Sequence, residues 1–237
     1  MDINFDEVIR NTSTSKHSKL FPKNIFLILV GSTGSGKTNL LLNLLLDPTN
    51  QIYFDDFYIW ATTLHQPKYI FLKEHFESLE KYLFHQYNTK VEIGHFFTHD
   101  EEIIDPKELD ETKSHLMIFD DVQNENQTRI KDYFCSGRHN NFNVFYLCQS
   151  LNHIKKHCIR ENANIFILFR LNEKTLKSFY ESHASSDMKY EEFKDFCEKA
   201  WQKDHGYVVI NLWSKPHDKK YIANYKEIYT PNKFNKM

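Results

Sequence analysis

Five short apolar runs recur along the first 170 residues of the chain, separated by polar stretches with helical patterns. They span residues 25–30, 57–61, 115–119, 144–148 and 165–169. Continuous apolar runs of this length are typical of strands that are buried on both faces of a parallel sheet. The pattern therefore predicts an α/β fold, a three-layer sandwich with a mainly parallel central sheet between helices.

The rest of the pattern predicts how the chain is organised. Residues 66–90 are polar and aromatic and predict one or two amphipathic helices. After residue 171, two helical segments (172–184 and 190–203) precede two alternating stretches that predict a terminal β-hairpin, residues 206–213 and 219–229. We expect a polar tail or arm over residues 1–23, a core over 24–170, and a C-terminal part over 171–237 that completes the same domain.

Composition narrows the class of protein. A chain of 237 residues suits one α/β domain, and a formal net charge of -2 excludes the strongly basic character of a DNA-coating protein. The four cysteines form no CxxC pair, so neither a disulfide framework nor a zinc site is expected. No apolar run approaches the roughly 18 to 20 residues of a membrane span, and the N-terminal residues lack an apolar signal core. We expect an intracellular protein that does not enter a membrane.

The stretch GSTGSGKT follows the first apolar run and opens a helical segment, the context that a phosphate-binding loop needs. Its glycines allow successive backbone N–H groups to point at phosphate oxygens, and the helix N-terminus adds the positive end of the helix dipole. Lys37 is expected to reach the β and γ phosphates, and Thr38 to help hold Mg²⁺. The predicted ATP-binding residues are Gly31, Ser32, Thr33, Gly34, Ser35, Gly36, Lys37 and Thr38.

Two carboxylates end the third apolar run. Asp120 is placed at the carboxyl edge of the sheet, where it can bind Mg²⁺ together with Thr38. Asp121 follows and can orient and deprotonate the water that attacks the γ phosphate, which favours hydrolysis over nucleotide storage. The alternative is that Asp121 only caps the following helix, expected over about residues 124–136.

Further polar residues follow along the chain. Gln149 ends the fourth apolar run and is expected to act as a sensor of the γ phosphate or the attacking water. Arg138 stands on a loop that should lie to the side of the domain, which favours an action in trans on the γ phosphate of a neighbouring subunit. The alternatives are a surface ion pair of Arg138 or the same trans role for Arg160, whereas Arg170 is interpreted as structural or solvated.

With these motifs the chain resembles the FtsK/HerA superfamily, and within it the poxvirus-type genome-packaging ATPases of large DNA viruses, virophages and Polinton-like elements. The resemblance rests on GSTGSGKT, LMIFDD, GRHNNFNVFYLCQS and IRENANIFILFR, and it covers about residues 24–170. It implies a RecA-like core in a ring, with a hexamer favoured, that pumps double-stranded DNA into a preformed capsid. Asp121 stands where many members carry Glu, and no motif after residue 171 can be matched.

The same resemblance implies roles and partners. Lys37 and Thr38 take the phosphate-loop roles, Asp120 the metal role, and Asp121 with Gln149 and Arg138 the catalytic roles, Arg138 in trans. The implied partners are duplex DNA, bound without regard to sequence, and a capsid or portal-vertex protein, in the host cytoplasm or a virus factory or on the virion. The candidate residues for contacts with DNA phosphates are Lys68, Lys73 and the basic tail over residues 215–237. Tyr69 is interpreted as a core or interface residue.

Two other functions remain open from the residues alone. A nucleoside or nucleotide kinase would share the phosphate loop, but it needs an acceptor site and usually an Arg-rich lid, and only five of the 30 basic residues are Arg. A non-translocating assembly ATPase would keep the same nucleotide site and lack stimulation by DNA. Phosphate release with and without duplex DNA distinguishes these functions.

Overall fold

The computed structural model describes residue 17 and residues 21–46, 52–136, 141–154 and 156–234 of the 237-residue chain. Within these residues, nine strands form one sheet in the order β3-β2-β4-β5-β1-β6-β7-β8-β9. In chain order the strands are β1 (Phe26–Val30), β2 (Asp56–Ala61), β3 (Gly94–Phe97), β4 (His115–Asp120), β5 (Phe142–Cys148), β6 (Ile165–Phe169), β7 (Tyr207–Asn211), β8 (Tyr221–Ala223) and β9 (Glu227–Tyr229).

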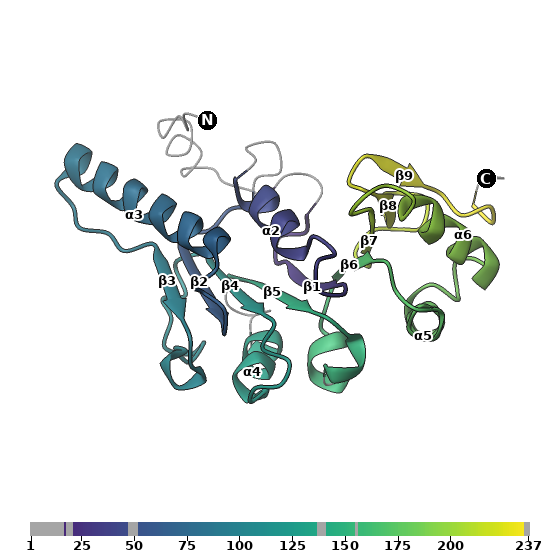
Figure 1. Ribbon diagram of the computed structural model, residues 1–237, viewed down its shortest axis with the longest axis horizontal. Coiled ribbons are helices and arrows are strands. Elements are labelled where there is room, and N and C mark those ends of the chain that lie inside the picture. The colour runs from purple at the N-terminus through teal and green to yellow at the C-terminus, as the bar shows by residue number, and fades with distance from the viewer. Residues whose placement is uncertain (1–16, 18–20, 47–51, 137–140, 155, 235–237) are drawn as a thin grey trace. The chain divides into compact units, whose positions relative to one another are not determined.

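Helices connect most of these strands (Figure 1). The α-helices are α2 (Lys37–Leu46), α3 (Pro67–Tyr87), α4 (Thr128–Ser136), α5 (Glu173–His183) and α6 (Tyr190–Ala200). Shorter elements are the 3-10 helices η1 (Asp100–Glu102) and η2 (Leu151–His153) and the π-helix η3 (Lys156–Arg160). None of the helices that the structure describes is long and apolar enough to span a membrane.

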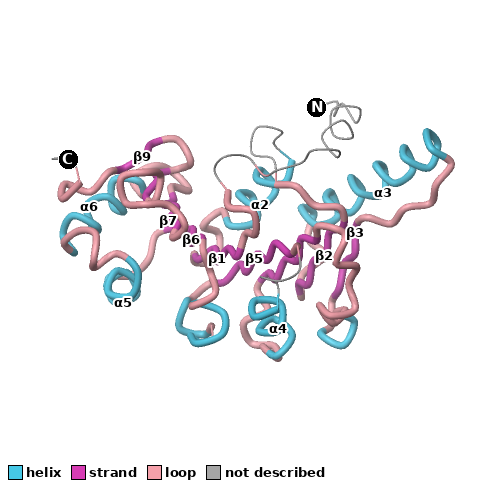
Figure 2. Tube along the Cα trace, turned by 180° about the vertical axis from the view of Figure 1, so that it is seen from behind, coloured by secondary structure: helices cyan, strands magenta, loops and turns pink. Residues whose placement is uncertain are grey.

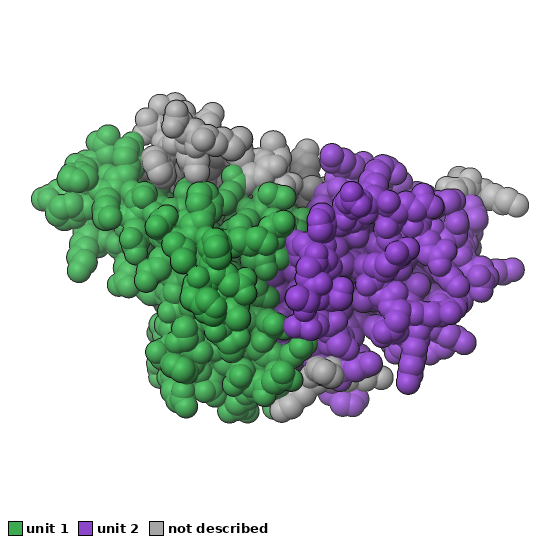
Figure 3. Space-filling view, in the orientation of Figure 1, with its two compact units in different colours: residues 1–24, 38–144 green, residues 25–37, 145–237 purple. Residues whose placement is uncertain are grey.

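The chain divides into two compact units (Figure 3). Unit 1 comprises Met1–Asn24 and Thr38–Val144, and unit 2 comprises Ile25–Lys37 and Phe145–Met237. The division passes through the chain between Lys37 and Thr38 and through β5. The predicted boundaries after residues 23 and 170 stay predictions, and most of the predicted tail lies outside the described residues.

Unit 1 has helices on both faces of its part of the sheet. Strand β2 pairs in parallel with β3 and with β4, and Phe57 lies opposite Leu116 in that register. Helix α3 covers this face, because the ring of Phe76 stacks on Phe57 with centroids 4.6 Å apart. Phe119 is three residues after Leu116 and therefore faces the other side, where its ring meets Tyr133 of α4 at 5.7 Å. The predicted layers are confirmed here.

Unit 2 combines a parallel pair with an antiparallel meander. Strand β1 pairs in parallel with β6, whereas β6–β7, β7–β8 and β8–β9 are antiparallel. Phe166 on β6 contacts Phe179 of α5 at 5.1 Å, and Tyr221 on β8 contacts Phe193 of α6 at 6.5 Å. Because Phe166 and Tyr221 are both paired with Ile210, α5 and α6 cover the same face.

All five strands expected from apolar runs are present, as are the two helices after residue 171. The segment 66–90 contains one long helix, α3, and the expected hairpin has a third strand, β9. Strand β3 was not expected from the sequence. Its four residues are all only partly buried, so it lacks the continuous apolar character that revealed the inner strands.

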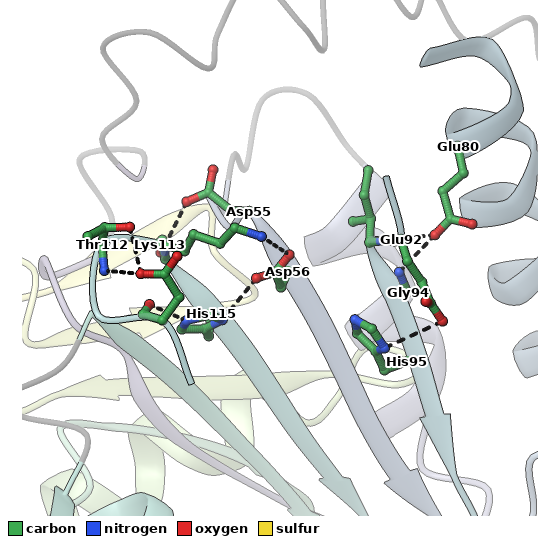
Figure 4. Close-up of polar contacts among 12 residues, drawn as sticks. Asp55, Asp56, Glu80, Glu92, Gly94, His95, Thr112, Lys113 and His115 are labelled. Carbon is green, nitrogen blue, oxygen red and sulfur yellow. Dashed lines mark hydrogen bonds and ion pairs between the residues drawn. The ribbon is translucent and has the colours of Figure 1, made fainter. Parts of the chain in front are cut away.

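A buried charge cluster joins the amino ends of β2 and β4 (Figure 4). Asp56 is 6% exposed, accepts a hydrogen bond from Lys113 Nζ at 3.1 Å, and its Oδ2 lies 3.3 Å from His115 Nδ1. Burial alone would raise the pKa of Asp56, but the hydrogen bonds and charges of His115 and Lys113 outweigh it and hold that pKa below its usual value. The ionised form of Asp56 therefore stabilises the fold.

The substitution Asp56→Asn is expected to lower the free energy of unfolding by about 1 to 3 kcal/mol at neutral pH, because it removes the charge that its two partners face. A depressed pKa gives stability that is present above the unfolded value and lost as the pH falls. The gap between variant and wild type should therefore narrow below about pH 4. Denaturant unfolding at several pH values measures this difference in the free energy of unfolding. The control is Glu74→Gln, which changes an exposed residue of α3. A gap that does not change with pH would contradict this assignment.

Candidate functional site

The phosphate loop predicted from the sequence joins β1 to α2 (Figure 2). Gly34 and Gly36 have φ angles of 78° and 108°, which side chains rarely adopt. Gly31 is required for space, because a Cβ there would lie 2.8 Å from Cβ of Phe169. Gly34 and Gly36 thus allow the backbone to curve, and Gly31 allows close packing. The loop from Gly31 to Lys37 belongs to unit 2.

Two polar groups in this loop fit the binding of phosphate. Lys37 Nζ donates to the carbonyl oxygens of Gly31 and Ser32 at 2.7 and 3.0 Å, so its ammonium is held against the loop itself. Ser35 Oγ is buried and has no hydrogen-bond partner among the described residues. A buried hydroxyl without a partner is costly, and a phosphate oxygen in the loop would satisfy it. The loop therefore suits the triphosphate of ATP.

In unit 1, Thr38 and Asp120 come together as the sequence predicts. Thr38 Oγ1 donates to Asp120 Oδ2 at 3.5 Å, although 82 residues separate them. Neighbouring ligands in an octahedral Mg²⁺ shell, with bonds of 2.0 to 2.1 Å, lie roughly 3 Å apart. A hydroxyl and a carboxylate at this separation fit Mg²⁺, which prefers oxygen ligands. When bound, the ion would neutralise charge on the phosphates.

Tyr69 is a residue of this site that sequence reasoning missed. It lies on the first turn of α3, is 1% exposed, and its hydroxyl donates a hydrogen bond to Asp120 Oδ2. Asp120 is four residues after Leu116 and faces the side of the sheet that α3 covers. The interpretation of Tyr69 as a core residue is correct for its ring, but its hydroxyl holds the carboxylate. Nothing in the spacing of Tyr69 and Asp120 along the chain could reveal this contact.

The substitution Tyr69→Phe is expected to raise the Mg²⁺ concentration needed for half-maximal hydrolysis by about tenfold, because the carboxylate loses the donor that orients it. A titration of phosphate release against Mg²⁺ measures the shift. Tyr133→Phe is the matched control, because it removes a buried hydroxyl that binds the carbonyl of Ile104 instead. Equal Mg²⁺ dependence in both variants would contradict a positioning role for Tyr69.

Asp121 has a left-handed backbone, with φ of 56°. A non-glycine residue in this region is uncommon, and Asp is one of the few types that tolerate it. Helix α4 begins only at Thr128, so Asp121 does not cap it and that alternative is wrong. Strained backbone persists where surrounding structure enforces it, often at functional sites. The role of Asp121 as catalytic carboxylate stays a prediction.

Gln149 follows the end of β5 and is exposed. The preceding carbonyl, that of Cys148, accepts a hydrogen bond from Gly31 N at 3.1 Å. Gln149 is therefore next to the first residue of the phosphate loop within unit 2, as its position in the series of strand ends predicts. This position suits a side chain that responds to bound phosphate, and the sensor role stays a prediction.

The four arginines after residue 120 lie in different surroundings, and one of them is outside the described residues. Arg138 lies outside the described residues. Arg160 lines a cavity of about 10 Å³ together with residues of α5 such as Ser178 and His183, and its buried Nε has no hydrogen-bond partner among the described residues. Arg129 pairs with Asp105 at 2.9 Å, and Arg170 is exposed after β6. Because Arg160 is turned to a cavity beside α5, it is less suited than an exposed side chain to reach a neighbouring subunit.

The family model described as Poxvirus A32 protein matches residues 13–189. No curated protein matches the chain. Among solved structures, the genome packaging NTPase B204 from Sulfolobus turreted icosahedral virus 2 in complex with sulfate has a TM-score of 0.57 at 14% identity, covering 86% of this chain and 96% of that one.

A second structure, B204, the DNA-packaging ATPase from Sulfolobus Turreted Icosahedral Virus, has a TM-score of 0.55 at 14% identity, covering 85% of this chain and 97% of that one. At such identities the likeness concerns the fold. It confirms the predicted fold class, an α/β phosphate-loop NTPase fold with a mostly parallel sheet.

Proposed function

The chain belongs to the Poxvirus A32 protein family, whose model matches residues 13–189, and we propose that it is an ATP hydrolase that packages a viral genome. In this proposal it moves double-stranded DNA into a preformed capsid, and ATP is hydrolysed at the subunit interfaces of a ring. Solved structures of similar fold are described as genome-packaging or DNA-packaging enzymes, which supports the same class of function.

The observation that carries the proposal is the pair of Thr38 and Asp120. A phosphate loop alone is compatible with any nucleotide-binding protein. Here the last residue of the loop motif lies 3.5 Å from a carboxylate at the end of a buried strand, and the next residue, Asp121, is a second carboxylate. A metal-binding pair followed by a further carboxylate supports hydrolysis of ATP.

The residues of the site would each have a separate role in the hydrolysis of ATP. Backbone N–H groups of the loop and Ser35 Oγ bind the phosphates, and Lys37 leaves the carbonyls of Gly31 and Ser32 to neutralise the β and γ oxygens. Tyr69 keeps Asp120 oriented toward Thr38. Asp121 accepts a proton from the attacking water, and Gln149 donates to the γ phosphate or to that water.

In this proposal a neighbouring subunit completes the site, so hydrolysis would require a ring. Arg138 is proposed to stabilise the charge on the γ phosphate of an adjacent subunit, with a hexamer favoured. Exposed Lys68 and Lys73 on α3 and the basic C-terminal residues are proposed to grip DNA phosphates without reading sequence. Work on a capsid would place the protein in the host cytoplasm, in a virus factory or on the virion.

Translocation is tested by displacement of a third strand from a duplex that carries a triplex at one end. The proposal expects ATP-dependent release of the third strand by the wild-type protein and none by Lys37→Ala. Turnover of ATP without strand release, at every duplex length tried, would favour the non-translocating assembly ATPase. Transfer of the γ phosphate to a nucleoside or nucleotide would favour the kinase.

The trans role is tested by mixing two inactive proteins. Arg138→Ala should bind ATP and fail to hydrolyse it, and addition of Asp121→Ala subunits should restore part of the activity, because some interfaces then combine an intact arginine with an intact carboxylate. Arg160→Ala is the matched control and should remain active. If mixing restores nothing, the trans role moves to Arg160 or away from both arginines.

A further inference from the structure

A histidine from the C-terminal part of the chain contacts the phosphate loop. His205 Nδ1 lies 3.0 Å from the carbonyl oxygen of Ser35, across 170 residues of sequence. A carbonyl oxygen can only accept a hydrogen bond, so Nδ1 carries the hydrogen and donates it. The His205 ring also covers Gly36, where a Cβ would lie 3.2 to 3.4 Å from its atoms. Both residues of the loop therefore meet the same side chain, within unit 2.

The turn that carries His205 is held in place from several sides. Trp201 directly follows α6 and donates its indole N–H to the carbonyl of Leu168 on β6 at 3.0 Å. Gly206 leaves no room for a side chain, because a Cβ would lie 2.0 Å from the carbonyl oxygen of Ala200. His205 itself has φ of 55°. The turn that carries His205 is thus fixed to the sheet, and this holds the ring in place at the phosphate loop.

The contact determines the direction of one amide in the loop. A trans peptide is planar, and its C=O and N–H groups point in opposite directions. The carbonyl of Ser35 and the N–H of Gly36 belong to the same peptide. When the carbonyl is bound to His205, the Gly36 N–H is turned away from His205, which leaves it available as a phosphate donor of the kind that such loops use.

We infer that His205 is a positioning residue of the nucleotide site, which holds the Ser35–Gly36 peptide in the orientation that binds the triphosphate. The inference rests on the proposed function, since it assumes that the loop binds ATP. It assigns a role to the part of the chain after residue 171, for which the sequence offers no motif. His205 touches the loop and need not touch the reacting atoms.

The test compares variants that differ in the donor and share the backbone. Both Asn and Gly accept a φ near 55°, but only His205→Asn retains a side-chain N–H that can reach a carbonyl. His205→Gly is expected to weaken binding of a non-hydrolysable ATP analogue roughly three- to tenfold, the range for loss of one hydrogen bond. The affinity of His205→Asn for the same analogue should lie within about twofold of wild type, a smaller change than loss of the hydrogen bond would cause. Calorimetric titration at a temperature where both variants are folded measures these affinities.

Binding of AMP separates loss of this one donor from general damage to the nucleotide site, which would weaken the binding of AMP as well. AMP lacks the β and γ phosphates, so its affinity should be equal in wild type, His205→Asn and His205→Gly. If His205→Gly does not fold, His205→Leu replaces it, because Leu has nearly the shape of Asn but has no donor and adds no charge beside the phosphates. The inference is overturned if the donor-free variant binds the analogue as tightly as wild type, or if His205→Asn is equally weak.

Lys37→Ala separates failure of this inference from failure of the proposed function. If Lys37→Ala loses the analogue and the donor-free His205 variant does not, only the role of His205 is wrong. If Lys37→Ala binds the analogue as well as wild type does, the loop is not the nucleotide site, and the proposed function fails with it.

Discussion

The substitution Lys37→Ala is expected to reduce ATP hydrolysis by more than about a hundredfold, comparable to the loss of a main electrostatic contact to a transition state. The ammonium is already positioned at the loop, where it donates to the carbonyls of Gly31 and Ser32. With a triphosphate bound, the same group reaches the β and γ oxygens, whose charge it neutralises as the bond breaks. Alanine supplies neither the charge nor the donors.

Phosphate release at saturating ATP and Mg²⁺ measures this effect. Lys174→Ala is the matched control, because it removes an exposed lysine of α5 in the same unit and should leave hydrolysis unchanged. Thermal unfolding of both variants shows whether the fold is retained. Hydrolysis by Lys37→Ala at more than a tenth of the wild-type rate would place the chemistry elsewhere than at this loop.

The second large effect is expected for Asp121→Asn, which should lower kcat about a hundredfold to ten-thousandfold while leaving ATP affinity nearly unchanged. Asn tolerates the left-handed backbone that Asp121 adopts, with φ of 56°. The substitution therefore removes the charge and keeps the conformation. An amide cannot accept the proton of the attacking water, so binding survives and turnover does not.

Single-turnover hydrolysis and binding of an ATP analogue together measure the effect of Asp121→Asn. Asp132→Asn on α4 is the control for loss of an acidic residue in the same unit. An equal loss of affinity and turnover in Asp121→Asn would mean that Asp121 supports binding, and unchanged turnover would transfer the role of base to another group.

The sequence predicted the elements whose signal is local. The inner strands are nearly fully apolar because both faces are buried, so their positions were evident from short windows. The pairing of Thr38 with Asp120 was also predictable, because the carboxyl ends of parallel strands meet at one edge of a sheet. Strand β3 was missed, because its residues are only partly buried.

Contacts that depend on the tertiary structure could not be predicted from the sequence. Tyr69 looked like one more aromatic residue of an amphipathic helix, and only the packing of α3 on the sheet brings its hydroxyl to Asp120. His205 is an isolated histidine without a motif, and it reaches Ser35 through a turn between α6 and β7. The left-handed backbone of Asp121 likewise results from its surroundings, since Asp adopts many conformations.

Phosphate release with and without duplex DNA, measured together with the mass of the protein in solution, decides whether hydrolysis of ATP drives movement of DNA. We expect duplex DNA of any sequence to raise the rate of phosphate release, the protein to form a ring-sized oligomer when nucleotide is present, and Lys37→Ala to show no release. A rate that DNA leaves unchanged, from a protein that stays monomeric under every nucleotide condition, would contradict this expectation.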